Sequence, residues 1–168
     1  MGRAITSRSQ PTPTGLTTML RPKSTWREKL LDSKGHPTIA PVRESMSRRW
    51  GSGTMVIPAP IEVDEIMRSV RKGDLITIDQ IRERLAAKHG ADFACPMTTG
   101  IFAWIAAHAA DEAEQEGKQR ITPYWRTLKA GGELNPKYPG GIENLRARLE
   151  AEGHCVVQKR KRFFVSPQ

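Results

Sequence analysis

The two cysteines of this 168-residue sequence carry the side chains best suited to covalent chemistry. Cys95 directly precedes Pro96, a favoured first helical residue, and a helix N-terminus favours the nucleophilic thiolate. Cys95 is therefore a candidate nucleophile, although no base adjoins it. The alternative is a buried cysteine that acts as a small apolar residue. Cys155 follows His154, but neighbours in an extended chain point to opposite faces, which argues against a catalytic pair.

Metal and disulfide chemistry have weaker support. The cysteines lack CxxC spacing and are too few for a disulfide framework, so we expect reduced thiols. The histidines show no spacing typical of a metal site; they are His36, His89, His108 and His154. We therefore expect no metal and no other cofactor.

Positive charge gathers at the two ends of the sequence. The formal net charge is +9; residues 1–50 carry +7, residues 51–117 carry −5 and residues 118–168 carry +7. This distribution is typical of a protein that presents a cationic face to a polyanion, most often nucleic acid. Arg48-Arg49 and Lys159 to Arg162 are candidate phosphate contacts, with solvated charge as the alternative.

The length fits one modest domain with tails. No run approaches the roughly 18 apolar residues of a membrane-spanning helix. The first 15 residues also lack the apolar core of a secretion signal. We expect a soluble, cytoplasmic monomer with no membrane partner.

The N-terminal third predicts little regular structure. Residues 1–25 are rich in Ser, Thr, Pro and Gly and are expected to form a disordered arm. Residues 26–54 are expected to form a basic extension that contains one short helix, from Trp26 to Leu31. The apolar run from Met55 to Ile57 predicts a strand and opens the main domain, so that a domain boundary is expected near residues 50–55.

Three helices with readable ends follow. The first covers residues 61–70. The second opens at Thr77, whose hydroxyl forms a capping box with Gln80, and it ends at Gly90. The third covers residues 96–116. The short connector between the last two is typical of a helix-turn-helix, with residues 96–116 as the recognition helix.

The C-terminal third is predicted to contain extended segments and a loop as well as a helix. Residues 120–129 predict an extended segment, residues 130–141 a glycine- and proline-rich loop, and residues 141–152 a helix. The basic run from Lys159 to Arg162 predicts a small hairpin or a strand with a bend. Together the elements indicate an α/β domain of the winged-helix type. Its expected bounds are residues 55–153, followed by a basic tail over residues 154–168.

A family resemblance begins at residues 123–153, PYWRTLKAGGELNPKYPGGIENLRARLEAEG. This segment resembles the C-terminal signature of the O6-alkylguanine-DNA alkyltransferases, in which Pro-Cys-His-Arg precedes a strand, a glycine-rich wing and a helix ending in Glu-Gly. Upstream, GDLITIDQIRERLAAKHG and PMTTGIFAWIAAHA are similar to the helix-turn-helix of that family. The resemblance implies a DNA-binding domain that enters the minor groove and rotates a damaged guanine into a pocket.

The reactive residues of that signature are replaced here. Pro123 and Arg126 match the motif, but Tyr124 stands at the nucleophile position and Trp125 at that of the activating histidine. A phenol is a much weaker acid than a thiol, so self-alkylation by the family mechanism is not expected. Glu152 matches the glutamate that orients the missing histidine. The sequence resembles the alkyltransferase-like branch, which lacks the cysteine yet binds alkylated DNA.

Other pocket positions also depart from the family. Met97 lies where the family inserts an arginine into the duplex, Ile78 where it has a phosphate-rotating tyrosine, and Glu116 near its pocket asparagine. Two interpretations of Tyr124 and Trp125 stay open. They line a base pocket and stack on a flipped base, or they fill the former pocket as core residues.

Contacts to DNA are expected from the recognition helix and the wing. Candidates in the first turn of the helix, where free N–H groups and hydroxyls meet phosphate, are Met97, Thr98, Thr99 and Gly100. Helix capping is the alternative role of the two threonines. Candidates in or just before the wing, whose glycines permit a close approach to a sugar-phosphate strand, are Arg126, Lys129, Lys137 and Tyr138.

The sequence therefore predicts a non-catalytic protein that binds double-stranded DNA, senses O6-alkylguanine damage and passes it to other repair proteins. The enzymatic alternative is a divergent methylated-DNA–protein-cysteine methyltransferase that uses Cys95. The third alternative is an RNA-binding or ribosome-associated scaffold, which the basic ends and the loss of the flipping residues favour.

Overall fold

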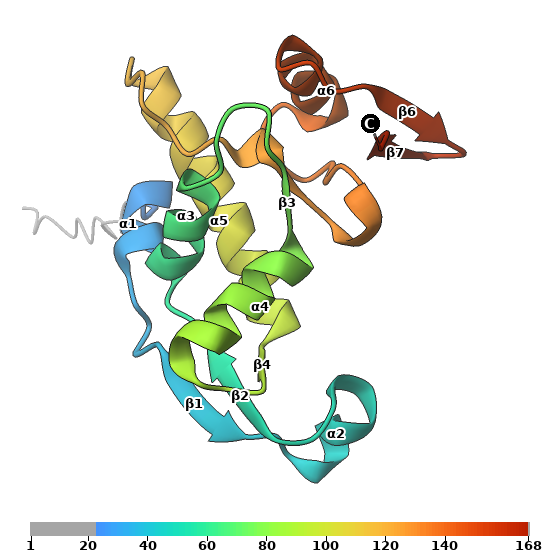
Figure 1. The fold of residues 1–168 in the computed structure, drawn as a ribbon. Helices are drawn as coiled ribbons and strands as arrows, with labels where there is room; N and C mark the ends of the chain where they lie inside the picture. The colour runs from blue at the N-terminus through green and yellow to red at the C-terminus, as the bar shows by residue number, and fades with distance from the viewer. Residues whose placement is uncertain (1–22, 168) are drawn as a thin grey trace, which may run out of the picture.

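The computed structural model describes residues 23–167, and nearly all of the arm expected over residues 1–25 lies outside this range. The described chain is a mixed α/β fold in which several helices pack around one long helix and the strands form three small sheets (Figure 1). This agrees with the fold class that the order of elements predicts.

The predicted helix-turn-helix is confirmed. It consists of α4 (Ile78–His89) and α5 (Pro96–Gln115), and α3 (Pro60–Arg68) packs against both. The capping box forms as expected, because the backbone N–H of Gln80 donates to Thr77 Oγ1 over 3.3 Å and Gln80 Oε1 accepts from the Thr77 N–H over 2.9 Å. Gly90 ends α4 with φ +63°, a left-handed conformation that glycine adopts without strain.

Helix α5 crosses the centre of the molecule and buries a stripe of small side chains. The buried alanines are Ala103, Ala106, Ala107, Ala109 and Ala110. Small side chains let other helices approach closely, and both α3 and α1 (Trp26–Leu31) pack against α5. No helix within residues 23–167 is long and apolar enough to cross a membrane.

Parts of residues 26–54, which are expected as an extension outside the main domain, pack onto that domain. Leu30 of α1 is part of the hydrophobic core. Strand β1 (Thr38–Pro41) pairs antiparallel with β2 (Thr54–Ile57), which pairs in parallel with β4 (Phe93–Ala94). The sequence reading missed β1 and the helix α2 (Glu44–Trp50) because β1 is exposed along its whole length and α2 buries no residue, so neither has an apolar period.

The C-terminal part joins the rest through short pairings. Strand β3 (Ile76–Thr77) pairs in parallel with β5 (Thr127–Leu128). A 3-10 turn, η2 (Ala130–Gly132), opens the glycine-rich loop, and α6 (Gly141–Ala151) follows it. Strands β6 (Val156–Lys159) and β7 (Arg162–Val165) form the expected hairpin with a basic tip.

The prediction of an extended segment over residues 120–129 is wrong at its centre. Residues Tyr124–Arg126 form a 3-10 turn, η1, closed by a hydrogen bond of 3.0 Å from the Arg126 N–H to the Pro123 carbonyl. The turn places consecutive side chains on different sides of the chain, so that Tyr124 enters the core while Arg126 reaches α6 and the end of α3. Strand geometry begins only at Thr127.

Candidate nucleic-acid interface

An open cavity of about 820 Å³ lies beside the first half of α5. One wall is α5, a second is the start of α4, and the third is the loop of residues 129–137, which we call the glycine loop. The lining residues are Ile78, Asp79, Met97, Gly100, Ile101, Trp104, His108, Lys129, Ala130, Asn135 and Lys137. The cavity thus joins the predicted recognition helix to the predicted wing.

The α5 wall of the cavity is apolar and accessible. Met97 is 60% exposed and Ile101 is 46% exposed, although large apolar side chains of a helix normally face the core. Both lie on one face of α5 with Trp104, because they are spaced by four and three residues. An exposed apolar stripe beside a cavity is typical of a surface that contacts a ligand or another macromolecule.

The opposite wall is fixed to α5 by its backbone. Trp104 Nε1 donates to the carbonyl of Lys137 over 3.2 Å, and His108 Nε2 lies 3.3 Å from the same oxygen. The Asn135 side-chain oxygen accepts from the Lys137 N–H over 3.1 Å. The exposed ammonium groups of Lys129 and Lys137 therefore stand on a loop whose position α5 determines.

A buried carboxylate ties the glycine loop to the C-terminal hairpin. Glu133 is 6% exposed, forms a hydrogen-bonded ion pair with Arg162 of β7, and lies 3.3 Å from Lys129 Nζ. The hydrogen bond from Arg162 lowers the pKa of Glu133 to about 2. An isolated pairing of Glu133 with Phe164 adds a backbone link. The loop is thus anchored on both sides.

Aromatic rings from distant parts of the sequence support the cavity from behind. The ring of Trp26, in α1, stacks on His108 at 4.6 Å between ring centroids, and it meets Trp104 edge-on at 4.8 Å. Sequence reasoning identified neither Trp26 nor Asn135 as part of the site. The one sequence pattern that points to this part of the site is the spacing of apolar and aromatic residues along α5, which predicts the face that Trp26 packs against.

Tyr124, the residue that the sequence resemblance aligns with a nucleophile, does not line the cavity. It is fully buried, and its hydroxyl accepts a hydrogen bond of 3.0 Å from Asn144 Nδ2. Burial raises the pKa of Tyr124, so the phenol stays protonated. Of the two interpretations that the sequence leaves open, the structure shows the packed one for Tyr124. Trp125 is also absent from the lining and carries the Arg148 guanidinium 4.6 Å from its ring centroid.

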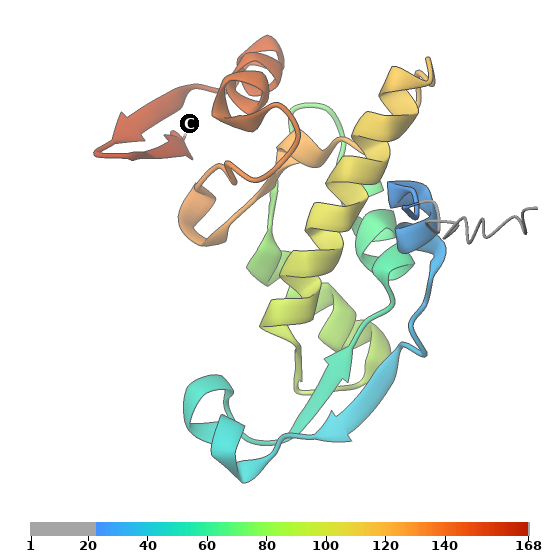
Figure 2. The ribbon, with the colours of Figure 1, turned by 180° about the vertical axis from the view of Figure 1, so that it is seen from behind.

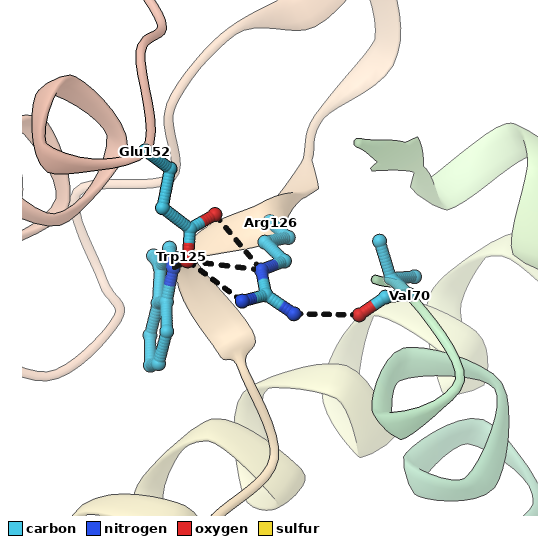
Figure 3. A network of polar contacts seen from close by, with 4 residues as sticks. All are labelled: Val70, Trp125, Arg126 and Glu152. Atoms are coloured by element: carbon cyan, nitrogen blue, oxygen red, sulfur yellow. Dashed lines mark hydrogen bonds and ion pairs between the residues drawn. The ribbon is translucent and has the colours of Figure 1, made fainter. Parts of the chain in front are cut away.

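The two residues that follow Tyr124, Trp125 and Arg126, form a polar network with Glu152 and the Val70 carbonyl (Figure 3). Arg126 binds both carboxylate oxygens of Glu152, at 2.7 Å and 2.9 Å, and donates to the Val70 carbonyl over 2.6 Å. The indole N–H of Trp125 donates to Glu152 over 3.0 Å. Burial favours the protonated acid, but the hydrogen bonds from Arg126 and Trp125 outweigh it and lower the pKa of Glu152. Trp125 stands at the position that the resemblance gives to a histidine, and it donates a hydrogen bond to Glu152.

Several predicted DNA contacts are corrected by burial or pairing. Thr99 is fully buried, and its hydroxyl donates to the carbonyl of Cys95, four residues earlier, over 2.7 Å, which is a bond within the helix and not a cap of its free N–H groups. Tyr138 is 3% exposed, and burial raises the pKa of its hydroxyl. The Arg126 side chain is only 13% exposed and is occupied by Glu152. These three side chains are already buried or paired, which argues against their predicted contacts with phosphate.

The remaining predicted contacts divide into two groups. Met97, Gly100, Lys129 and Lys137 all line the cavity, as does Ile78. Thr98 is half-buried, with its hydroxyl 3.5 Å from the Cys95 carbonyl.

Other residues named from the sequence lie away from the cavity. Glu116 pairs with Arg27 at the far end of α5, and Pro123 is buried.

Cys95 is not placed for nucleophilic attack. It is 6% exposed, precedes α5, and donates its N–H to the Val56 carbonyl over 2.9 Å. It does not line the cavity, and Cys155 is exposed at the start of the C-terminal hairpin. Within residues 23–167, no group of His, Cys, Asp and Glu side chains has the arrangement of a metal site.

Comparisons with known proteins give one structural likeness. No protein-family model and no curated protein matches the chain. Among solved structures, the chain is similar to S. pombe Atl1 in complex with damaged DNA containing O6-carboxymethylguanine. The alignment covers 64% of this chain and 87% of that chain, with 17% identity and a TM-score of 0.46. At this identity the likeness concerns the fold alone.

Proposed function

We propose that the protein binds double-stranded DNA without catalysis and examines its bases for alkyl damage in the cavity beside α5. The observation that carries this proposal is the cavity itself. It combines an exposed apolar wall on the second helix of a helix-turn-helix with two lysines on the facing loop, and no cysteine lines it. Binding of a duplex uses both features: cations neutralise the phosphates, and the faces of bases pack on apolar and aromatic side chains.

The glycine loop provides the phosphate side of this interface. Gly131 and Gly132 lie in this loop with φ values of +74° and +82°, and neither carries a side chain that would cover the backbone there. A sugar-phosphate strand can therefore approach the backbone closely while Lys129 and Lys137 neutralise phosphates.

The α5 wall provides the base side. Met97 projects from the first turn of α5 at the position where the family resemblance implies an arginine that enters the duplex. Methionine is among the apolar side chains that proteins insert between base steps, so Met97 takes this role as a wedge. The cavity behind it is large enough for an unstacked base, with Trp104 as a stacking surface and Asp79 and Asn135 as hydrogen-bonding groups for a base edge.

The same geometry argues for binding without transfer. A methyl group on a base in the cavity would meet no thiol, since Cys95 is buried outside the lining and Tyr124 is closed off in the core. The lesion would be held unchanged and left for other repair proteins.

Fluorescence anisotropy with matched duplexes tests the proposal. One duplex carries a single O6-methylguanine and the other carries guanine. We expect tighter binding to the damaged duplex and a loss of this preference in Met97→Ala and Trp104→Ala. Leu31→Ala is a matched control, because Leu31 is an exposed apolar residue of α1 that does not line this cavity.

Three results would contradict the proposal. Equal binding of the two duplexes by the wild type would rule out the recognition of alkyl damage. Tighter binding to structured RNA than to duplex DNA would favour the scaffold alternative. A mass increase of one methyl group after incubation with the damaged duplex, absent in Cys95→Ala, would favour the methyltransferase alternative.

A further inference from the structure

A projecting segment that contains a short helix lies near the end of the molecule that is farther from the C-terminal hairpin. It consists of β1, α2 and β2, residues 38–57, and we call it the basic arm. Helix α2 buries none of its residues, so the core does not explain its presence. Its exposed surface carries Arg48 and Arg49, with Arg43 just before its first turn.

The arginines of the basic arm are free. The guanidinium groups of Arg43, Arg48 and Arg49 make no ion pair or hydrogen bond within residues 23–167. Elsewhere, surface arginines such as Arg146 and Arg148 bind carboxylates at 2.7 Å and 2.6 Å. Residues 43–49 thus carry three unpaired guanidinium groups and one carboxylate, Glu44, and an external polyanion would supply the partners that these cations lack.

The base of the basic arm is fixed to the turn of the helix-turn-helix. Asp92, between α4 and α5, accepts from the N–H of Thr54 at 2.7 Å and from its hydroxyl at 3.0 Å. These hydrogen bonds lower the pKa of Asp92 and keep it ionised. Gly53 has φ +116°, and a Cβ there would lie 2.4 Å from Asp92 Oδ2, so only glycine fits this junction. The position of the arm is therefore set relative to the start of α5.

The basic arm and the β6–β7 hairpin extend to the same side of α5. In Figures 1 and 2 the hairpin lies near one end of the molecule and α2 near the other, and the first half of α5 and the glycine loop lie between them. The hairpin tip contributes its own cations, Lys159 to Arg162. Two cationic projections thus flank the cavity.

We infer that the basic arm binds the phosphate backbone of the duplex, on the flank of the cavity opposite to the hairpin. This inference rests on the proposed function, since it assigns a second contact surface to the same duplex. Its partner is a phosphodiester strand, because the guanidinium groups of Arg43, Arg48 and Arg49 are exposed and a guanidinium group can donate two parallel hydrogen bonds to phosphate oxygens.

The test is a variant with Arg43→Gln, Arg48→Gln and Arg49→Gln, measured by anisotropy at several salt concentrations. The slope of log K against log salt should become shallower by as much as about 2.7, since each phosphate contact contributes about 0.9. Affinity should fall equally for damaged and undamaged duplexes, because the arm does not touch the cavity. Duplexes shortened from one end should weaken wild-type binding and leave the variant unchanged.

A second triple variant controls for the loss of general charge. Arg71→Gln, Lys72→Gln and Arg120→Gln remove three exposed cations from the α3–β3 loop and from the segment after α5. This control should keep most of the wild-type slope and its full dependence on duplex length. Circular dichroism melts of both variants should match the wild type, because none of the six side chains is buried.

The outcomes separate the two claims. A wild-type protein that does not bind duplex DNA would overturn the proposed function and the arm with it. Wild-type binding with the same slope and length dependence in the arm variant would overturn the arm alone. An equal loss in the arm and control variants would also overturn it, because diffuse attraction would then replace a defined contact.

Discussion

Arg126→Met separates a structural role for this arginine from a contact with DNA. The side chains of Arg126 and Glu152 are 13% and 8% exposed, so the substitution leaves a buried carboxylate without its cation. Breaking a buried ion pair in this way costs about 3–5 kcal/mol. That loss is a large part of a typical stability of about 5–15 kcal/mol. At about 2–4 °C per kcal/mol for a chain of this size, the melting temperature should fall by about 6–20 °C.

Calorimetry and urea unfolding followed by tryptophan fluorescence measure this loss. The double variant Arg126→Met with Glu152→Leu should recover most of it, because two apolar side chains can replace a buried ion pair. Glu152→Gln serves as a milder variant that keeps a hydrogen-bond acceptor for Trp125. Below the melting transition, the salt dependence of DNA binding should match the wild type in all folded variants.

The opposite pattern would refute the reasoning. If Arg126→Met melted within 2 °C of the wild type and the salt slope fell by about 0.9, one phosphate contact would have been lost instead. The pH dependence gives an independent check. The pKa of Glu152 is lowered in the folded chain, so its stabilising effect is present above its unfolded pKa and is lost as the pH falls through the folded value. Glu152→Gln should lose this part of the acid sensitivity.

Three further predictions concern the core, the glycine loop and the cavity. Tyr124→Phe should lower the free energy of unfolding by about 0.5–1.5 kcal/mol, because it removes the hydrogen bond with Asn144, and it should leave DNA binding unchanged. A loss of lesion preference at unchanged stability would instead place Tyr124 in the binding site. The pKa of Glu133 is about 2, so its stabilising effect should be full above about pH 4.5 and disappear toward pH 2, whereas Glu133→Gln should show a flatter pH profile of unfolding. Trp104→Phe keeps a stacking ring but removes the hydrogen bond to the Lys137 carbonyl; lesion preference should fall less than in Trp104→Ala, and equal losses would show that ring stacking is unimportant.

Local chemistry made the two helices of the helix-turn-helix predictable. The capping box at Thr77, the glycine after α4 and the proline that opens α5 act within a few residues, so the sequence alone locates both helices of the helix-turn-helix. The C-terminal hairpin was also predictable, since apolar pairs flank a basic bend. Strand β1 and helix α2 were not, because they bury nothing and are held by pairing with β2 and by the junction at Asp92.

The candidate site shows the same division. The apolar face of α5 and the lysines of the glycine loop could be named from their positions in the predicted elements. Their meeting across one cavity, and the support from Trp26, depend on the packing of α1 against α5. No local pattern could supply this, since Trp26 and His108 are far apart in the sequence.

By itself, the sequence determined the charge distribution, the helix-turn-helix, and the absence of a cysteine at the nucleophile position of the resembling motif. Only the tertiary structure decided that Tyr124 is closed in the core, that Arg126 is bound to Glu152, and that Met97 remains exposed. The physical reason is that helix capping and charge are properties of neighbouring residues. Burial and pairing depend on which distant side chains fill the space around a group, and that space exists only in the folded chain.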